Sequence, residues 1–323
     1  MRFERLSGVA ASAMLLASLG QSALADDMTT VRFGVDPYTT GSQIWVAQDM
    51  GFFEDQGIDA QITTFATGVE AIDSMIVGRA DLAVGLDFPT VTRATNGRLT
   101  VLAGIFRANP GWHKLVVADE IKSAADLAGK KIGIATGTLE HLVTVKYLEA
   151  NGLSQDDVEL VGFTSLVELV ASLKSGRIDA SFVWADGTDK SIEDGEHYVL
   201  VDDSAAGLSS SAYITGLTSF VEENPEAVVA VLEAMDAASA YITENPEEAA
   251  AIIASHTRAP EDAVLRLLGY NTFKLALTEY ERTGFEAISA FAADTMNADI
   301  SFDTVVVPDY LMQVSPDAVQ LGE

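Results

Sequence analysis

An internal repeat constrains what this chain can fold into more than any other feature of its sequence. Residues 78–84, GRADLAV, have a counterpart in residues 176–182, GRIDASF. Upstream, FGV at 33–35 with the following TG at 40–41 is echoed, in the same order and at a similar offset, by IGI at 132–134 with TG at 136–137. Repeats at a fixed offset are the signature of a structural unit that is used more than once. We therefore expect two lobes of similar design.

Each half of the repeat alternates strand-like and helix-like segments. After the strand-loop-helix stretch 31–57, the first half is expected to form a strand at 58–65, a helix at 68–77, a strand at 82–86, a helix at 90–95 and a strand at 100–105. The second half is expected to form strands at 131–135, 158–161 and 180–184, with helices at 139–151 and 166–175. This alternation predicts an α/β fold with two mostly parallel sheets flanked by helices.

Two passages between the lobes are expected. The segment 106–118, which contains Asn109-Pro110-Gly111, is interpreted as the first crossing, and the small-residue passage near 208–214 as the return. Residues 27–113 and 210–323 would then form lobe one and residues 114–209 lobe two, with a ligand cleft between them. Later helices are expected to begin at the Asn-Pro pairs 224–225 and 245–246 and to pack on lobe one, because Asn caps helices and Pro suits their first position.

Residues 1–25 have the layout of a secretory signal peptide. Arg2 and Arg5 precede the apolar run 8–19, and ALA at 23–25 stands before two aspartates. This layout predicts export to the periplasm with cleavage after Ala25. The apolar run is too short to span a bilayer, so the exported chain is not expected to be embedded in the membrane.

The chain is strongly acidic and contains no cysteine. Its 19 Lys and Arg residues stand against 48 Asp and Glu residues, and without residues 1–25 the balance is 17 − 47 = −30. This charge argues against nucleic acid and anionic membrane surfaces as partners. The lack of cysteine removes disulfides, thiolate metal sites, cysteine nucleophiles and a lipid-modified cysteine anchor.

No motif of a hydrolase, nucleotide-binding enzyme or zinc protease occurs. The sequence lacks G-x-S-x-G, a P-loop, G-x-G-x-x-G and H-E-x-x-H, and its four histidines are scattered without metal-ligand spacing. We therefore expect no metal and no cofactor. His141 is retained as a candidate ligand contact because it lies near the start of the helix after residues 136–138, although a surface histidine is an alternative interpretation.

Acids, aromatics and hydroxyls gather instead at the predicted carboxyl ends of the strands, where ligands bind in open α/β sheets. Helix N-termini favour an anionic head group, whereas an aspartate beside an aromatic ring favours a cationic or hydrogen-bond-donating group. Together they predict a zwitterionic or amine-bearing ligand. For any single acid, a solvated turn or a helix cap is an equally good interpretation. The candidate ligand-binding residues are Asp36, Tyr38, Thr40, Gly68, Asp87, Phe88, Thr136, Thr138, His141, Trp184, Asp186 and Ser210.

Several short motifs follow one another in an order and spacing that together point to one family. They are VA at 46–47, GFFE at 51–54, GI at 57–58, GRAD at 78–81, FP at 88–89, LAGKKIG at 127–133 and GRIDASFVW at 176–184. In these motifs the chain resembles periplasmic solute-binding proteins of nitrate/sulfonate/taurine-type ABC importers. The resemblance implies a two-lobed type II periplasmic binding protein fold, a ligand in the cleft, and hinge closure that presents the liganded form to an ABC permease with its ATPase.

Two positions depart from the pattern of the taurine binders. Ala185-Asp186-Gly187 follows Trp184, where family members often carry a proline. Residues 209–211 are SSS, where taurine binders tend to place an acid. Asp87 and Asp186 are therefore predicted to supply the amine contact instead.

We predict from these features a monomeric binding component rather than an enzyme. Its solute would be a small zwitterionic or amine-bearing compound, such as taurine or a related organosulfonate, captured by cleft closure. One alternative is an enzyme of the same fold, like the pyrimidine-precursor synthase of thiamine biosynthesis or a menaquinone-pathway dehydratase. The synthase needs a cysteine-rich motif that this chain lacks, and both enzymes are cytoplasmic. Another alternative is a periplasmic ligand sensor that feeds a signalling receptor, which genomic neighbours would distinguish.

Overall fold

The computed structural model describes residues 28–208, 210–296 and 300–322. The predicted signal peptide 1–25 lies outside the described residues, as do Ser209 and the outermost ends of the predicted lobe one. Within the described ranges, no helix combines the length and the apolar character that crossing a membrane requires.

The larger of two sheets has seven strands in the order β12-β11-β4-β10-β3-β1-β2. Its strands are β1 (Thr29–Val35), β2 (Ile58–Thr64), β3 (Leu82–Leu86), β4 (Leu99–Ala108), β10 (Ser210–Leu217), β11 (Asn271–Thr278) and β12 (Val319–Gln320). The smaller sheet has five strands in the order β7-β6-β8-β5-β9. They are β5 (Lys114–Ala118), β6 (Lys131–Ala135), β7 (Glu159–Phe163), β8 (Ala180–Val183) and β9 (His197–Asp202).

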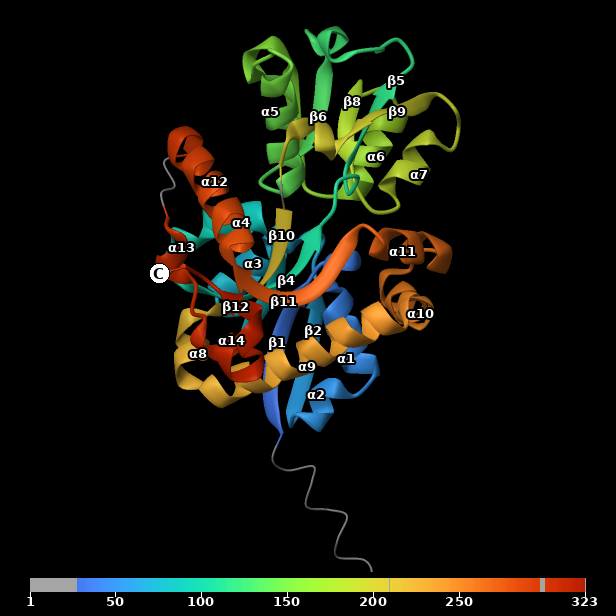
Figure 1. The fold of residues 1–323 in the computed structure, drawn as a ribbon. Coiled ribbons are helices and arrows are strands. Elements are labelled where there is room, and N and C mark those ends of the chain that lie inside the picture. Colours follow the sequence, from blue (N-terminus) through green and yellow to red (C-terminus); the bar gives the residue numbers. More distant parts are fainter. Residues whose placement is uncertain (1–27, 209, 297–299, 323) are drawn as a thin grey trace, which may run out of the picture.

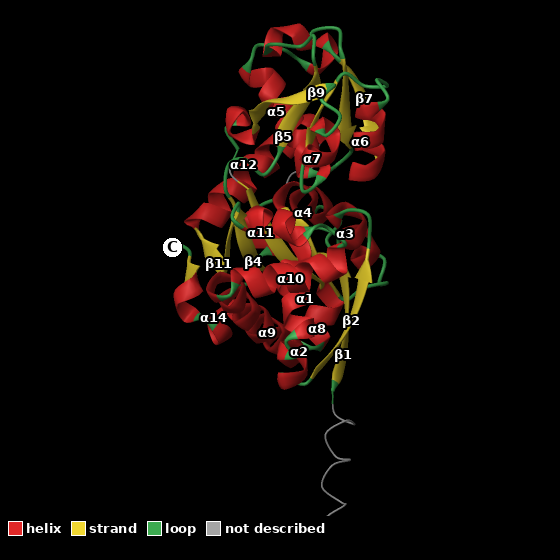
Figure 2. Ribbon diagram, turned by 90° about the vertical axis from the view of Figure 1, so that its right-hand side faces the viewer, coloured by secondary structure: helices red, strands yellow, loops and turns green. Residues whose placement is uncertain are grey.

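Helices surround both sheets, and we call each sheet with its helices the larger and the smaller lobe (Figures 1 and 2). The smaller lobe has α5 (Leu139–Ala150), α6 (Leu166–Lys174) and α7 (Gly187–Ile192). The larger lobe has α1 (Ser42–Asp49), α2 (Phe52–Asp55), α3 (Gly68–Ile76), α4 (Asp87–Ala94), α8 (Thr218–Glu223), α9 (Pro225–Glu244), α10 (Pro246–Thr257), α11 (Glu261–Leu268), α12 (Glu279–Met296), α13 (Phe302–Val305) and α14 (Asp309–Val314). Short 3₁₀ turns lie at η1 (Thr39–Gly41), η2 (Ala124–Leu127), η3 (Gln155–Asp157), η4 (Asp203–Ala206) and η5 (Pro316–Ala318).

The predicted class of two sheets flanked by helices is confirmed, and within it each sheet combines parallel and antiparallel pairs. β1 pairs parallel with β2 and β3, and β6 pairs parallel with β7 and β8. β10 runs antiparallel to β3 and β4, and β5 runs antiparallel to β8 and β9. The physical reason is the crossing of the chain. A strand that arrives from the other lobe enters its sheet from the edge where the parallel strands end, and it therefore runs the opposite way.

The repeated G-R-x-D motif has a structural role in both lobes. The carboxylate of Asp81 accepts a hydrogen bond from the backbone amide of Arg32 on β1 at 2.9 Å. The carboxylate of Asp179 accepts one from the backbone amide of Lys131 on β6 at 2.7 Å. In each lobe the aspartate thus fastens the turn before one strand to the start of a neighbouring parallel strand. The echo in the sequence marks the same connection built twice.

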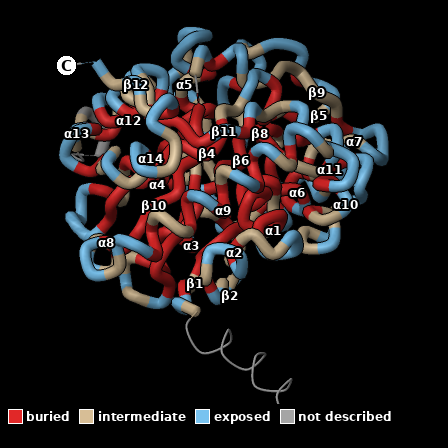
Figure 3. The backbone as a smooth tube through the Cα atoms, turned by 60° about the horizontal axis from the view of Figure 1, so that its bottom comes forward, coloured by how far each residue is buried: buried red, intermediate tan, exposed pale blue. Residues whose placement is uncertain are grey.

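The central strands and the parts of the helices that cover them are buried, as the red stretches of the tube in Figure 3 show. Apolar side chains of these segments form the core. α9 packs against α1 and β11 of the larger lobe, and both α9 and α10 begin at the proline of their Asn-Pro pair. The prediction for these two helices is therefore confirmed. Trp45 on α1 is 4% exposed and its ring stacks on His256 at 4.6 Å, as expected for a side chain of the core.

Candidate ligand-binding site

A small cavity of about 40 Å³ lies where the carboxyl ends of strands from both lobes meet. This volume is room for a few water molecules or a compact solute. The larger lobe contributes the segment after β1, the start of α3 and the end of β3, and the smaller lobe contributes the start of α5 and the end of β8. The lining residues are Asp36, Tyr38, Thr40, Thr67, Gly68, Val69, Leu86, Pro89, Trp112, His113, Thr138, Leu139, Glu140 and Trp184.

Asp36 supplies a buried carboxylate to this cavity. It follows β1, and its carboxylate accepts a hydrogen bond from the backbone amide of Tyr38 at 3.0 Å. Burial raises the pKa of Asp36 to about 6, although hydrogen bonds from Tyr38 and Thr40 oppose the rise. Gly68 opens α3 so near that a Cβ on it would lie 3.7 Å from an Asp36 oxygen. A buried carboxylate of this kind is suited to pair with a cation.

Two aromatic rings from opposite lobes form a wall beside Asp36. The rings of Tyr38 and Trp184 meet edge to face with centroids 6.0 Å apart. Burial and the charges of Asp36 and Asp186 raise the pKa of Tyr38 above its usual range, so the phenol stays protonated and able to donate. Aromatic faces next to a carboxylate favour an ammonium group.

His113 is a lining residue that the sequence interpretation missed. It is 2% exposed, and its ring Nδ1 lies 3.2 Å from a carboxylate oxygen of Asp203. Burial raises the pKa of Asp203, but the hydrogen bond and charge of His113 outweigh burial and leave that pKa below its usual range. The only signal in the sequence is its place in the predicted first crossing, beside Trp112.

Glu140 is the second buried acid of the lining and was also missed. Its carboxyl group accepts hydrogen bonds from the backbone amide of Ala135 at 2.6 Å and the hydroxyl of Thr144 at 2.8 Å. Burial raises the pKa of Glu140 to about 8, so it is mostly neutral at pH 7. The two donors are the last residue of β6 and a residue one turn further along α5. Glu140 therefore fastens the start of α5 rather than offering a free charge.

Asp87 lies behind the cavity and not among its lining residues. It begins α4, whereas the sequence predicted a helix only from residue 90. Its carboxylate accepts hydrogen bonds from the backbone amides of Ser211 at 3.0 Å and Phe88 at 2.9 Å, and from the hydroxyl of Ser210 at 3.4 Å. Burial raises its pKa to about 7. Asp87 thus joins α4 to β10.

The remaining candidates do not line the small cavity. Thr136 is exposed. Its hydroxyl lies beside Gly162, 2.7 Å from the position that a Cβ on this glycine would take. His141 meets the ring of Phe88 edge to face at 6.4 Å, and burial lowers its pKa. Ser210 lines a separate cavity of about 20 Å³ behind His113.

Asp186 faces a different and larger cavity of about 630 Å³. There it forms an ion pair with Lys190 at 2.5 Å. The structure therefore brings six of the predicted residues to the small cavity, namely Asp36, Tyr38, Thr40, Gly68, Thr138 and Trp184. Their role in binding stays a prediction.

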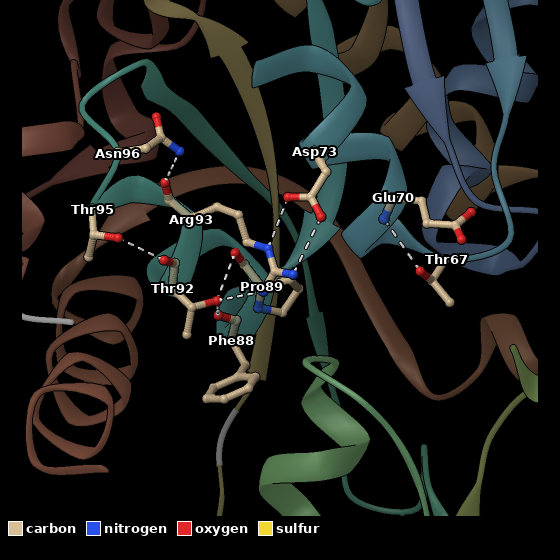
Figure 4. A network of polar contacts seen from close by, with 9 residues as sticks. All are labelled: Thr67, Glu70, Asp73, Phe88, Pro89, Thr92, Arg93, Thr95 and Asn96. Carbon is tan, nitrogen blue, oxygen red and sulfur yellow. Dashed lines mark hydrogen bonds and ion pairs between the residues drawn. The ribbon is translucent and has the colours of Figure 1, made fainter. Parts of the chain in front are cut away.

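Arg93, on α4 of the larger lobe, lies at a contact between the two lobes. Its guanidinium pairs with Asp73 of α3 at 3.1 Å (Figure 4). The same guanidinium lies 3.4 Å from where a Cβ on Gly137, in the smaller lobe, would stand. Lys146 on α5 meets the ring of Phe291 on α12, 4.5 Å from its centroid, in a second contact between the lobes. At these contacts, next to α4, the two lobes touch each other.

The electrostatics of the small cavity are those of an acidic site. Asp36 is the acid of its lining that can offer a charge near pH 7, since Glu140 is mostly neutral there; the lining includes neither lysine nor arginine, and His113 is occupied by Asp203. In the described ranges of the chain, no group of three or more metal-ligating side chains is found. The arrangement can hold a positively charged or hydrogen-bond-donating group beside two aromatic rings.

Comparisons with known proteins agree with this architecture. The family model described as "NMT1/THI5 like" matches residues 38–249. A relative from Brucella abortus (strain 2308), named as a binding protein, is 29% identical over 238 residues, which cover 69% of this chain and 70% of the relative.

Two solved structures have the same fold. The periplasmic aliphatic sulphonate binding protein SsuA from Escherichia coli superimposes with a TM-score of 0.71 at 20% identity, covering 85% of this chain and 95% of that one. The periplasmic nitrate-binding protein NrtA from Synechocystis PCC 6803 gives a TM-score of 0.72 at 17% identity, covering 90% and 89%. The predicted periplasmic binding protein fold is confirmed.

Proposed function

We propose, from the premise that this chain belongs to the NMT1/THI5-like family, that it is the solute-binding component of an ABC importer and captures a small amine-bearing organic solute. Taurine and related amino-sulfonates are the candidates. The family, and the sulfonate- and nitrate-binding proteins that share the fold, support a role in solute capture. The charge of the small cavity supports the amine.

The observation that carries the proposal is the carboxylate of Asp36. It is 6% exposed, lines the small cavity, and has no ion pair with a cationic side chain in the described part of the chain. A buried charge without a partner is costly, and a solute ammonium would supply that partner. The rings of Tyr38 and Trp184 would enclose the ammonium.

The anionic end of the same solute would face the N-termini of two helices. α3 begins at Gly68 and α5 at Leu139, and the first residues of both helices line the small cavity. Backbone amides at a helix N-terminus, together with the positive end of the helix dipole, favour an anion. A zwitterion thus fits the cavity better than nitrate does.

We propose the remaining features of the system on the same basis. The two lobes would be residues 27–113 with 210–323 and residues 114–209, a division supported by the membership of strands in the two sheets. The chain would be exported to the periplasm with cleavage after Ala25, act without catalysis as a monomer, and deliver its solute to a permease with its ATPase. Closure of the lobes around the solute would be the signal that the permease recognises.

Isothermal titration and thermal shifts of the exported chain test this proposal. Taurine and ethanesulfonate form a matched pair, because they share the sulfonate and differ in the amine. We expect taurine to bind and ethanesulfonate, nitrate and betaines to bind far more weakly. Small amines and aminopyrimidines complete the panel.

The variant Asp36→Asn keeps an acceptor for the amide of Tyr38 and removes the charge. Loss of one charge-assisted hydrogen bond costs about 1.5–3 kcal/mol, so affinity for taurine should fall roughly tenfold to more than a hundredfold. Asp55→Asn on the exposed face of α2 is the control. If ethanesulfonate or nitrate binds as well as taurine, and Asp36→Asn leaves affinity unchanged, the amine proposal is wrong.

A further inference from the structure

The larger cavity, of about 630 Å³, is of the size that small-molecule sites usually have, roughly 300–1,000 Å³. It lies between α6 and α7 of the smaller lobe and the α10–α11 region of the larger lobe, which face each other in Figure 1. Its walls are mainly apolar, with Leu166 and Val170 on one side and Val264 and Leu267 on the other. Val167, at the same wall, is 72% exposed.

This cavity adjoins the proposed ligand site, with which it shares one lining residue. Tyr38 lines both cavities. Its neighbour in space, Trp184, lines the small one, while Ala185 and Asp186, next in the chain, line the large one. A solute held at Asp36 would have to pass the Tyr38–Trp184 pair to reach the larger cavity.

The walls carry features that are typical of ligand sites. Thr39 is buried and lines the cavity, and its hydroxyl has no hydrogen-bond partner among the residues that the structure describes. Ala185, on the wall from the smaller lobe, has a positive φ angle of 50°, a strained conformation for a residue other than glycine. Such strain concentrates at ligand clamps and switch regions. The φ of 60° at Arg258, on the opposite wall, is that of the left-handed residue that ends α10.

The charge of the lining differs from that of the chain. The lining contains Lys174, Lys190 and Arg258 against Asp186 and Glu193, whereas the whole chain has a net charge of −29. Lys174 pairs with Glu193 and Lys190 with Asp186. Arg258 is exposed and has no ion pair within the part of the chain that the structure describes. It is therefore available to an anionic group of a ligand.

From these observations we infer that the larger cavity binds the apolar chain of solutes longer than taurine, with the amine at Asp36 and the anionic end at Arg258 in place of the helix N-termini that would face the sulfonate of taurine. The ligand class is then an ω-amino acid or ω-amino sulfonate whose methylene chain is longer than that of taurine. This inference rests on the proposed function, because it takes the amine at Asp36 as the fixed end.

A series of ω-amino acids tests the inference by isothermal titration. We would compare β-alanine, 4-aminobutanoate, 6-aminohexanoate and 8-aminooctanoate, with n-octylamine lacking the anionic end. Each methylene buried in the larger cavity should raise affinity about threefold to fourfold. n-Octylamine should bind more weakly than 8-aminooctanoate, and Arg258→Gln should remove that difference.

The variant Ala171→Trp fills the cavity from an exposed position of α6, where a large side chain does not disturb the core. It should abolish the gain with chain length and leave taurine binding unchanged. Ala240→Trp is the matched control, since Ala240 is exposed on α9 and outside both linings. Circular dichroism and thermal unfolding of both variants check the fold.

Three outcomes overturn the inference. If taurine binds through Asp36 but affinity is flat or falls as the chain lengthens, the larger cavity is not part of the site and the proposed function stands. The same holds if Ala171→Trp binds 8-aminooctanoate as well as the unaltered chain does. If no amine-bearing solute binds at all, the proposed function and the inference fail together.

Discussion

The carboxylate of Asp203 accepts a hydrogen bond from the backbone amide of His113 at 2.8 Å and lies 3.2 Å from the ring Nδ1 of the same residue. It also accepts one from the amide of Gly111 at 2.6 Å. Asp203 stands just before the second passage between the lobes, and residues 109–113 form the first. One carboxylate therefore fixes the two passages to each other, next to the proposed site.

The variant Asp203→Ala should lower the free energy of unfolding. Two buried backbone amides would lose their acceptor, and each costs about 1–3 kcal/mol. Urea unfolding at pH 7 measures the change. Asp119→Ala, at an exposed residue that pairs only with Lys122, should change stability by less than about 0.5 kcal/mol. Equal free energies of unfolding of the two variants would show that the link between the passages does not stabilise the fold.

Binding of taurine should weaken as pH falls through about 6. The pKa of Asp36 in the folded chain is about 6, and only the ionised carboxylate pairs with an ammonium. Below that pKa the affinity should fall about tenfold for each pH unit, because protonation competes with the ligand. Titrations between pH 5 and 7.5 test this. Asp36→Asn should bind weakly at every pH, and a stronger affinity at pH 5 than at pH 7.5 would contradict the assignment.

A long side chain at Gly137 should interfere with the contact between the lobes. Gly137 and Gly152 have φ angles of 78° and 75°, so both substitutions strain the backbone alike. A Cβ at Gly137 would touch the guanidinium of Arg93, whereas one at Gly152 would meet nothing within 4 Å. Overpacking costs about 1–3 kcal/mol. Gly137→Leu should therefore lose about tenfold or more in affinity for taurine.

Gly152→Leu is the control for that experiment. It should share the loss of stability that a positive φ imposes and keep its affinity. Equal affinities of the two variants would mean that the contact at Arg93 does not bear on binding.

Glu140 should make the chain less stable as pH rises. Its pKa is about 8 in the folded chain and near the ordinary 4.5 when unfolded. Between these values the folded state holds a proton that the unfolded state has lost, so the free energy of unfolding falls with rising pH. Each pKa unit corresponds to about 1.4 kcal/mol. Glu140→Gln should flatten the dependence between pH 5 and 8, measured by urea unfolding.

Glu149→Gln, at an exposed position on the same helix, is the control and should leave the pH dependence unchanged. An unchanged slope in Glu140→Gln would show that the group titrates normally in the folded chain.

The repeat and the periodicity of the sequence were sufficient for the elements, and the order of the short motifs was sufficient for the family. Predicted strands at 82–86 and 131–135 coincide with β3 and β6, and the predicted helix at 68–77 extends one residue beyond α3. Such elements can be predicted because the hydrophobic periodicity within a short segment shows which face of that segment is buried. The directions of β5 and β10 were not predictable in this way, because they depend on the edge from which a returning chain enters its sheet.

The candidate site was predictable only as a region. That Asp36, Tyr38 and Trp184 lie at strand ends follows from the order of segments along the chain. Asp87 and Asp186 lie at strand ends too, yet one turns back to β10 and the other faces the larger cavity. His113 and Glu140 carried no motif that marks them.

The sequence by itself determined two similar lobes, their strands and helices, and the strand ends at which a solute would be bound. It could do so because hydrophobic periodicity, turn residues and the repeat act over short distances along the chain. Only the tertiary structure decided which acids face the small cavity, how Asp203 joins the two passages, and that a larger cavity adjoins Tyr38. Those relationships depend on side-chain directions across two lobes, where residues far apart in the sequence come together.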